Sequence, residues 1–446
     1  MDHTLVRYHS RAFEQTTHEM VLKKLQERNY PGAIAQLPFD YDLAIRGLVI
    51  DKFKGNLLKV SRHGAIRGAF HGTRAMDFAS QKANYSSTYI DLRDTRYTSI
   101  DTAFSISTAN LFMQLVDLKD RSAQFNLPDY ATMSSDLMRA VDDCHRDGSL
   151  KGIVRENLSK YIVKDEAVVQ GLERFKKHDK KLFVLTNSEF NYTKLLLDYA
   201  INPFLREHKH WQDLFEIVIT SAQKPRFFFD DLKFLKVNPA DGTMTNLEEP
   251  LKKGVFQGGC AGTFTRDLGL EGDDILYIGD HIYGDILRLK KDCNWRTAMV
   301  VEDLEAEIEK YRDVVPIQKE IDQLMNEKDP LEREHVELVC KKIESGDATR
   351  DTHIQDLQNM ISAKDKLIAE RIRAYQSHFN KYWGEVMRAG NEESYFAHQT
   401  ERFACIYMAK LSDLLQQPPR TYFRAPRRPL AHEMQTTGFL ADPSGH

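Results

Sequence analysis

The chain has 446 residues, 41% of them hydrophobic and 29% charged, which is the composition of a soluble globular protein with a sizeable core. Its 62 Lys and Arg residues and 66 Asp and Glu residues give a net charge of −4, which argues against nucleic acid or a membrane surface as a partner. No apolar run approaches the roughly 18 residues of a membrane span, and the first residues are too polar for a signal peptide. The five cysteines form no CxxC pair, so we expect a cytoplasmic protein without a disulfide framework or a zinc site.

The first 150 residues are predicted to combine helices with short hairpins. The amphipathic stretch THEMVLKKLQER, residues 17–28, predicts a helix that ends at the turn NYPG. Residues 45–72 carry short β-branched runs broken by glycine, which is typical of hairpins. Residues 107–118 and 134–145 have helical spacing of their apolar residues.

From residue 150 to residue 301 the pattern changes to alternating strands and helices. Four short runs are apolar throughout, namely residues 181–187, 215–220, 275–280 and 297–301. Strands that are apolar on both faces belong to parallel sheets covered by helices. In such sheets ligands bind beyond the carboxyl ends of the strands, so functional residues are expected where each run stops.

Residues 302–375 are highly charged and have helical spacing. Pro330 and the stretch ESGDATRD are expected to divide this region into helices, giving a hairpin. Its apolar stripes fit an arm for oligomer contacts and a surface packed on the protein's own core equally well. One stripe consists of Leu304, Ile308, Tyr311 and Val315, and the other of Ile354, Leu357, Ile361 and Ile368.

Polar side chains that suit a phosphate group follow two of the apolar runs. Thr186, Asn187 and Ser188 offer hydroxyl, amide and backbone N–H groups to phosphate oxygens, although the same residues are ordinary in turns and helix caps. Lys224 follows the run 215–220 and could neutralise a phosphoryl group as a compact charge, or be a solvated surface lysine.

An acidic pair follows the third run, where Gly279 and Asp280 end the strand and Asp285 comes five residues later. Two carboxylates at a strand end suit Mg²⁺, which keeps several waters and takes few protein ligands. A capping Asp and a loop Asp would give the same spacing. At the start of the chain, Asp2 and Thr4 form a further short polar motif.

Taken in order, these motifs resemble the haloacid dehalogenase superfamily of phosphohydrolases. Its four motifs are DxDx(T/V), a Thr or Ser at a strand end, a Lys, and an acidic pair of the GDx4D type. No GxxxxGK(S/T), GxSxG or HExxH motif competes. Over nearly the whole chain, segments such as RGLVIDKFKGNLLKV, TNSEFNYT and GDHIYGDIL are similar to the cytosolic purine 5′-nucleotidases of the IMP/GMP-preferring type.

The resemblance implies an α/β fold with a haloacid dehalogenase-type, Rossmann-like parallel sheet core, an inserted cap and a C-terminal helical extension. Residues 1–34 and 151–301 would form the core, with its N-terminal strand truncated, and residues 35–150 the cap. Residues 302–375 would form the charged helical arm, and residues 376–446 a segment packed on the core. A homo-oligomer is expected from the same resemblance.

The resemblance also implies Mg²⁺-dependent hydrolysis of purine nucleoside 5′-monophosphates through a phospho-aspartyl intermediate. Asp2 would be the general acid and base, and the metal would be held at Asp2, Asp280 and Asp285. The phosphoryl oxygens would be bound by Thr186, Asn187, Ser188 and Lys224.

Two further sets of residues follow from the resemblance. The substrate base and sugar would contact Phe104, Asp142, His145 and Lys151, although Met138 replaces an Arg of the family pattern and His145 could be a surface histidine at a helix end. A candidate site for a purine nucleotide effector comprises Tyr283, Lys291, Gln399 and Arg402. Asp101 and Phe403 depart from the family pattern at that site.

The nucleophile of the first motif is expected one residue before Met1, at the end of an apolar strand. Three interpretations therefore remain open. The native protein is a purine 5′-nucleotidase and Met1 is an internal residue of it. Alternatively, the chain is a catalytically impaired nucleotide-binding protein, or it is a haloacid dehalogenase-type phosphatase for other phosphomonoesters.

Overall fold

All four predicted apolar runs form strands at the centre of the protein. The computed structural model describes residues 1–86, 89–121, 125–346, 350–425, 430, 432 and 433. The strands are β8 (Phe183–Leu185), β9 (Ile217–Thr220), β13 (Leu276–Gly279) and β14 (Arg296–Val300). β8 pairs parallel with β9, and β13 pairs parallel with β14, as expected for strands that are buried on both faces.

These strands lie in two sheets rather than in one. The first sheet has the order β11-β10-β12-β9-β8, in which β12 (Gly254–Gly258) is parallel to β9, whereas β10 (Phe234–Val237) and β11 (Met244–Asn246) are antiparallel. The second is the parallel sheet β13-β14-β17, which ends at β17 (Ile406–Met408). No strand of the described residues pairs with both β8 and β13. The single haloacid dehalogenase-type sheet therefore remains a prediction, although a mixed α/β fold is present.

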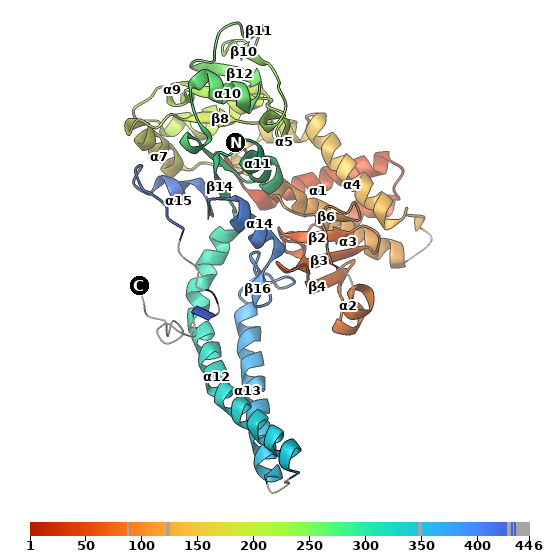
Figure 1. Cartoon of the computed structure of the whole chain (residues 1–446). Helices are drawn as coiled ribbons and strands as arrows, with labels where there is room; N and C mark the ends of the chain where they lie inside the picture. The colour runs from red at the N-terminus through yellow and green to blue at the C-terminus, as the bar shows by residue number, and fades with distance from the viewer. Residues whose placement is uncertain (87–88, 122–124, 347–349, 426–429, 431, 434–446) are drawn as a thin grey trace.

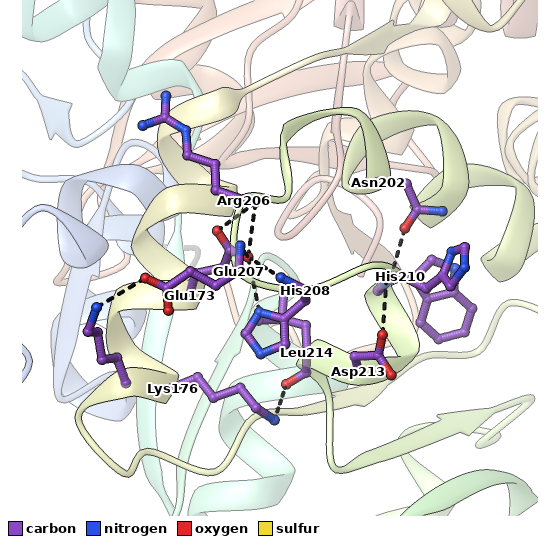
Figure 2. A network of polar contacts seen from close by, with 11 residues as sticks. Glu173, Lys176, Asn202, Arg206, Glu207, His208, His210, Asp213 and Leu214 are labelled. Atoms are coloured by element: carbon purple, nitrogen blue, oxygen red, sulfur yellow. Dashed lines mark hydrogen bonds and ion pairs between the residues drawn. The ribbon is translucent and has the colours of Figure 1, made fainter.

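Helices α7 (Glu166–Lys177), α8 (Phe190–Ala200) and α10 (Ala261–Leu268) lie beside the first sheet (Figure 1). Glu173 of α7 fixes the loop that follows α8 (Figure 2). One of its carboxylate oxygens accepts N–H groups of Glu207 and His208 at 2.8 and 3.1 Å, and the other accepts the N–H of Arg206 at 3.1 Å. Burial alone would raise the pKa of Glu173, but hydrogen bonds from His208 and these N–H groups lower it.

The N-terminal part of the chain forms α1 (Ser10–Glu27) and a separate antiparallel sheet. Its strand order is β5-β4-β3-β2-β6. The hairpins predicted for residues 45–72 are confirmed, since β2 (Leu48–Asp51), β3 (Asn56–Val60) and β4 (Ile66–His71) are antiparallel neighbours. The predicted helices are α3 (Ile106–Arg121) and α4 (Tyr130–Arg146). One hydrophobic core joins α1, α3 and α4 to α8.

The charged region forms a helical arm that projects away from the sheets (Figure 1). It consists of α12 (Asp303–Ser345) and α13 (Asp351–Gln376). The expectation that Pro330 interrupts the arm is wrong, because Pro316 and Pro330 both lie inside α12, which ends before Gly346. A proline removes one backbone hydrogen bond of a helix, and at Pro330 this loss is offset by α13, which forms ion pairs with Lys328 and Lys342 on either side of the proline.

Beyond the arm the chain returns to the sheets. It forms α14 (Tyr395–Phe403), strand β17 and α15 (Leu411–Leu415), and α15 contacts α7. Residues 434–446, the end of the predicted C-terminal segment, lie outside the described residues. Among the described helices, none combines the length and apolar character that a membrane crossing needs.

Candidate active site

The first residues of the chain lie between the ends of β8 and β13. Asp2 accepts a hydrogen bond from the Ser188 hydroxyl, with 3.0 Å between Oδ2 and Oγ. Thr4 is buried, and its hydroxyl donates to Oδ1 of Asp280 at 2.9 Å. Three motifs that are far apart in the sequence therefore meet at the carboxyl ends of two parallel strands, where α/β folds place their ligands.

A pair of buried tyrosines completes the surroundings of Asp2. The hydroxyl of Tyr8 donates to Oδ1 of Asp2 at 2.7 Å and lies 3.2 Å from the hydroxyl of Tyr192. Burial and the neighbouring Asp2 carboxylate raise the pKa of both tyrosines, which keeps the two hydroxyls protonated. Both carboxylate oxygens of Asp2 thus accept a hydrogen bond, so its orientation is fixed.

Lys224 and Asp285 form a buried ion pair, with 2.6 Å between Nζ and Oδ1. The Tyr277 hydroxyl lies 2.9 Å from Nζ and 3.1 Å from the same carboxylate oxygen. Burial alone would raise the pKa of Asp285, but Lys224 lowers it to about 2. Burial opposes the charge of Lys224, yet Asp285 and Tyr277 outweigh that effect and raise its pKa. Lys224 is therefore a fixed positive charge, as the binding of a phosphoryl group requires.

Gly279 permits Asp285 to lie beside the end of β13. A Cβ atom at this position would lie 2.6 Å from Oδ2 of Asp285, closer than atoms can approach. Asp285 itself belongs to a turn of π-helix, residues Ile282–Leu287, and its Oδ2 accepts the N–H of His281 at 3.3 Å. The glycine is thus needed for close approach of a side chain, a role that its position in the sequence pattern alone does not reveal.

The turn after β8 is hydrogen-bonded to the loop that carries Lys224. Asn187 accepts the Lys224 N–H at 2.6 Å and donates to the Lys224 carbonyl at 3.0 Å. The Thr186 hydroxyl accepts the N–H of Ser188 at 3.0 Å. Both side chains hold the two loops in place, and their predicted contacts with phosphate oxygens remain predictions.

The amino nitrogen of Met1 lies among the charged groups of the site. Burial and the neighbouring Lys224 lower the pKa of this amino group, while Asp2, Asp280 and Asp285 oppose that change. The charges of Lys224 and of the three carboxylates therefore act on this amino group in opposite directions.

The carboxylates of the site fit the chemistry of Mg²⁺. Asp2 and Asp280 offer oxygen ligands, and Mg²⁺ is commonly bound by one or two carboxylates together with waters. Among the described residues there is no group of three or more His, Cys, Asp or Glu side chains arranged to hold a metal ion. Asp285 differs from the other two because it forms an ion pair with Lys224. Its participation in such a metal site remains a prediction.

The residues predicted for the substrate base lie next to Asp2. Phe104 and His145 have ring centroids 5.8 Å apart in an edge-to-face arrangement. Burial lowers the pKa of His145, and the nearby Lys151 lowers it further, whereas Asp142 and Asp2 raise it. Lys151 places its amino group 5.1 Å from the ring centre of Tyr192. The ring centre of Phe104 also lies 6.4 Å from that of Tyr8, which is hydrogen-bonded to Asp2.

The residues predicted for an effector come together on the π-helical turn η8 (Ile282–Leu287), α11 (Arg288–Asp292) and α14. The Gln399 amide donates to the Tyr283 hydroxyl at 2.8 Å. Lys291 and Arg402 lie 5.8 and 5.2 Å from the ring centre of Phe403. Phe403, which departs from the family pattern, thus keeps an aromatic ring near both cations. Effector binding at this place remains a prediction.

His3 and Glu302 link the site to the helical arm, which sequence reasoning missed. His3 is buried, and its Nδ1 lies 3.0 Å from Oε2 of Glu302, the residue before α12. Burial would raise the pKa of Glu302, but His3, Arg46 and Ser10 lower it to about 2. Burial would lower the pKa of His3, and Glu302 raises it. Tyr8, Tyr192 and Tyr277 were missed as well. All these contacts are tertiary, and only the proximity of His3 and Tyr8 to Asp2 in the sequence could have indicated them.

Comparison with known proteins indicates the family to which this chain belongs. The sequence profile of the 5′ nucleotidase family matches residues 1–435, which include every segment of the site. A 5′-nucleotidase domain-containing protein of Dictyostelium discoideum is 25% identical over 450 residues, an alignment that covers 97% of this chain and 72% of the relative. The similarity therefore extends over the sheets, the N-terminal hairpins and the helical arm together.

Proposed function

Because the chain belongs to the 5′ nucleotidase family, we propose that it takes part in the Mg²⁺-dependent hydrolysis of purine nucleoside 5′-monophosphates. Family membership supports a phosphoric monoester hydrolase that acts on nucleoside monophosphates. The arrangement of Asp2, Ser188, Lys224 and Asp280, which is fixed by the contacts Asp2–Ser188, Thr4–Asp280 and Lys224–Asp285, carries the rest of the proposal. It combines a fixed cation for the phosphoryl group with carboxylates for acid–base chemistry.

In the proposed reaction the phosphoryl group lies between Lys224 and the hydroxyl of Ser188. Lys224 balances the charge on the phosphoryl oxygens, which is the main requirement of phosphoryl transfer. The backbone carbonyl of Asp2 and the carboxylate of Asp280 would hold Mg²⁺, and the cation would supply further neutralisation of the same oxygens. Asp285 keeps Lys224 charged and in place.

Asp2 is proposed to move the protons. It donates one to the 5′-oxygen of the leaving nucleoside and accepts one from the water that releases phosphate. The nucleophile is proposed to be an aspartate bonded to the Met1 nitrogen, which would form a phospho-aspartyl intermediate and so divide one displacement into two. The burial of Met1 and the contact of the adjacent Asp2 with Ser188 support this position.

A purine is the proposed base. The edge-to-face pair of Phe104 and His145 offers an apolar surface beside Asp2, and Lys151 offers a cation to a base carbonyl. A panel of IMP, GMP, AMP and CMP with a non-nucleotide phosphomonoester tests this preference. Equal rates across the panel would favour a phosphatase of broad specificity.

The decisive assay measures phosphate release from IMP by the 446-residue chain and by the same chain with an aspartate placed before Met1. We expect the extended protein to be the more active, and Asp280→Asn to reduce its rate at least about 100-fold. Asp273→Asn is the matched control, because its carboxylate is 67% exposed and pairs with Arg296 at the surface. If neither protein releases phosphate but both bind IMP, the nucleotide-binding interpretation replaces the enzymatic one. Codons upstream of Met1 that encode a stop or an unrelated sequence would contradict the position of the nucleophile.

A further inference from the structure

The outer face of α12 exposes a row of large apolar side chains. Their exposed fractions are 49% for Ile308, 48% for Val315, 48% for Met325, 57% for Val336 and 78% for Ile343. Ile308 and Val315 are seven residues apart, as are Val336 and Ile343, so each pair lies on one side of the helix. The face toward α13 uses other residues, among which Val314, Ile321 and Leu338 are buried.

Four of these five residues occupy positions that are symmetric along the helix. Reversal of α12 about the point between Met325 and Asn326 exchanges Ile308 with Ile343 and Val315 with Val336, whereas Met325 exchanges with Asn326. The types of the four residues, Ile, Val, Val and Ile, read the same in both directions. An interface between identical chains with two-fold symmetry needs this property, because each residue must meet its counterpart in both directions.

We propose that α12 binds α12 of a second copy of this chain in an antiparallel pair, so that the protein dimerises through its helical arms. Ile308 then packs against Ile343 of the partner subunit, and Val315 packs against Val336 of the partner subunit. The contact extends over about 50 Å at 1.5 Å per residue. The arm projects freely from the sheets, so two such arms can lie side by side with the sheets at opposite ends (Figure 1).

Charged residues along the row agree in part with this pairing. Lys319 is exposed, and no ion pair of its side chain is found in the part of the chain that the structure describes. Its symmetric counterpart is Glu332, whose side chain is 47% exposed and pairs with Lys328 at 3.0 Å. In the antiparallel pair Lys319 of each chain faces Glu332 of the partner subunit, which gives two such contacts. Asp322 faces Asp329 of the partner subunit and opposes association, so we expect a dimer that dissociates on dilution.

Cross-linking tests the register without any need for catalysis. In a protein in which the exposed Cys340 and Cys405 are replaced by Ser, Val315→Cys and Val336→Cys are prepared separately. A short bismaleimide should join Val315→Cys to Val336→Cys when the two proteins are mixed. Neither protein alone should be joined, since identical positions lie about 30 Å apart in the antiparallel pair. Cross-linking of Val315→Cys to itself would contradict the proposal.

Molar mass in solution tests the interface. We expect the 51.6 kDa chain to double its mass with rising concentration, and Val315→Glu or Val336→Glu to raise the dissociation constant about tenfold or more. Met360→Glu is the control, because Met360 is 51% exposed but lies on α13. Lys319→Glu should weaken the dimer, and Lys319→Glu combined with Glu332→Lys should restore it. A chain that stays monomeric at every concentration, or a dimer that Val315→Glu leaves unchanged, overturns the proposal.

Discussion

Replacement of Asp285 by Asn isolates the ion pair that holds Lys224 in the site. The two side chains are 7% and 10% exposed, and their charged atoms lie 2.6 Å apart. Asn keeps the shape of Asp285 but removes its charge, which leaves the Lys224 ammonium buried beside a neutral amide and the Tyr277 hydroxyl. Removal of one member of a buried pair typically destabilises a protein by about 3–5 kcal/mol, and we expect a loss in this range.

Two control proteins separate this effect from a general loss of charge. Glu249→Gln breaks the pair between Glu249 and Lys252, in which both side chains are 75% exposed, and should leave the free energy of unfolding nearly unchanged. Lys224→Met combined with Asp285→Asn removes the unpaired charge and should recover most of the loss. The double variant thus distinguishes an isolated charge from damage to the turn that carries Asp285.

Urea unfolding followed by tryptophan fluorescence measures these differences. Trp295 is buried, and its ring centre lies 6.3 Å from that of Tyr277, so its emission reports on this part of the core. The free energy of unfolding is compared for the wild-type protein, Asp285→Asn, Glu249→Gln and the double variant. A loss below about 1 kcal/mol for Asp285→Asn would refute the reasoning, because it would mean that the pair is solvated like a surface pair.

Three further predictions concern other parts of the molecule. Glu173→Gln should destabilise the protein at neutral pH. Since the pKa of Glu173 is lowered from 4.5, its stabilising contribution is complete above that value and is lost as the pH falls below it, so thermal unfolding of the wild type and the variant should converge in acid. Gly279→Ala should cost about 1–3 kcal/mol through the clash with Asp285, whereas Gly262→Ala in α10, with nothing within 4 Å, should be neutral or stabilising in the same denaturation assay. Tyr8→Phe should lower kcat for IMP about tenfold and leave KM unchanged, because it removes a hydrogen bond that orients Asp2; an equal change in both constants would argue for a role in binding.

Residues at the ends of strands were the part of the site that the sequence could predict. Asp280 and Ser188 follow apolar runs, and parallel strands bring their carboxyl ends to one edge, so a common site follows from the pattern. Tyr277 could not be assigned in this way. It lies within the run that ends at Asp280 and has the appearance of a core residue, and its contact with Lys224 depends on the path of a loop.

Neighbour relations between elements were harder to predict than the elements themselves. The periodicity of an apolar run indicates a buried strand but does not specify its partners, and β8 and β13 indeed belong to different sheets. Pro330 shows a similar limit for helices. A local rule predicts a break there, whereas packing of α13 along α12 supplies contacts on both sides of the proline and keeps the helix continuous.

The position of Asp2 depends on contacts from every region of the protein. Ser188 comes from the loop after β8, and Tyr8 belongs to strand β1 (Arg7–Tyr8), which pairs with β7 (Ile162–Val163). The adjacent His3 is held by Glu302 at the start of α12. A motif of a few residues at the start of the chain therefore has a defined place only when the sheets, the N-terminal helices and the base of the arm are assembled. This explains why Asp2 and Thr4 alone are weak indications of function. The geometry around Asp2 is tertiary, and any change that shifts the base of α12 is expected to reach Asp2 through His3.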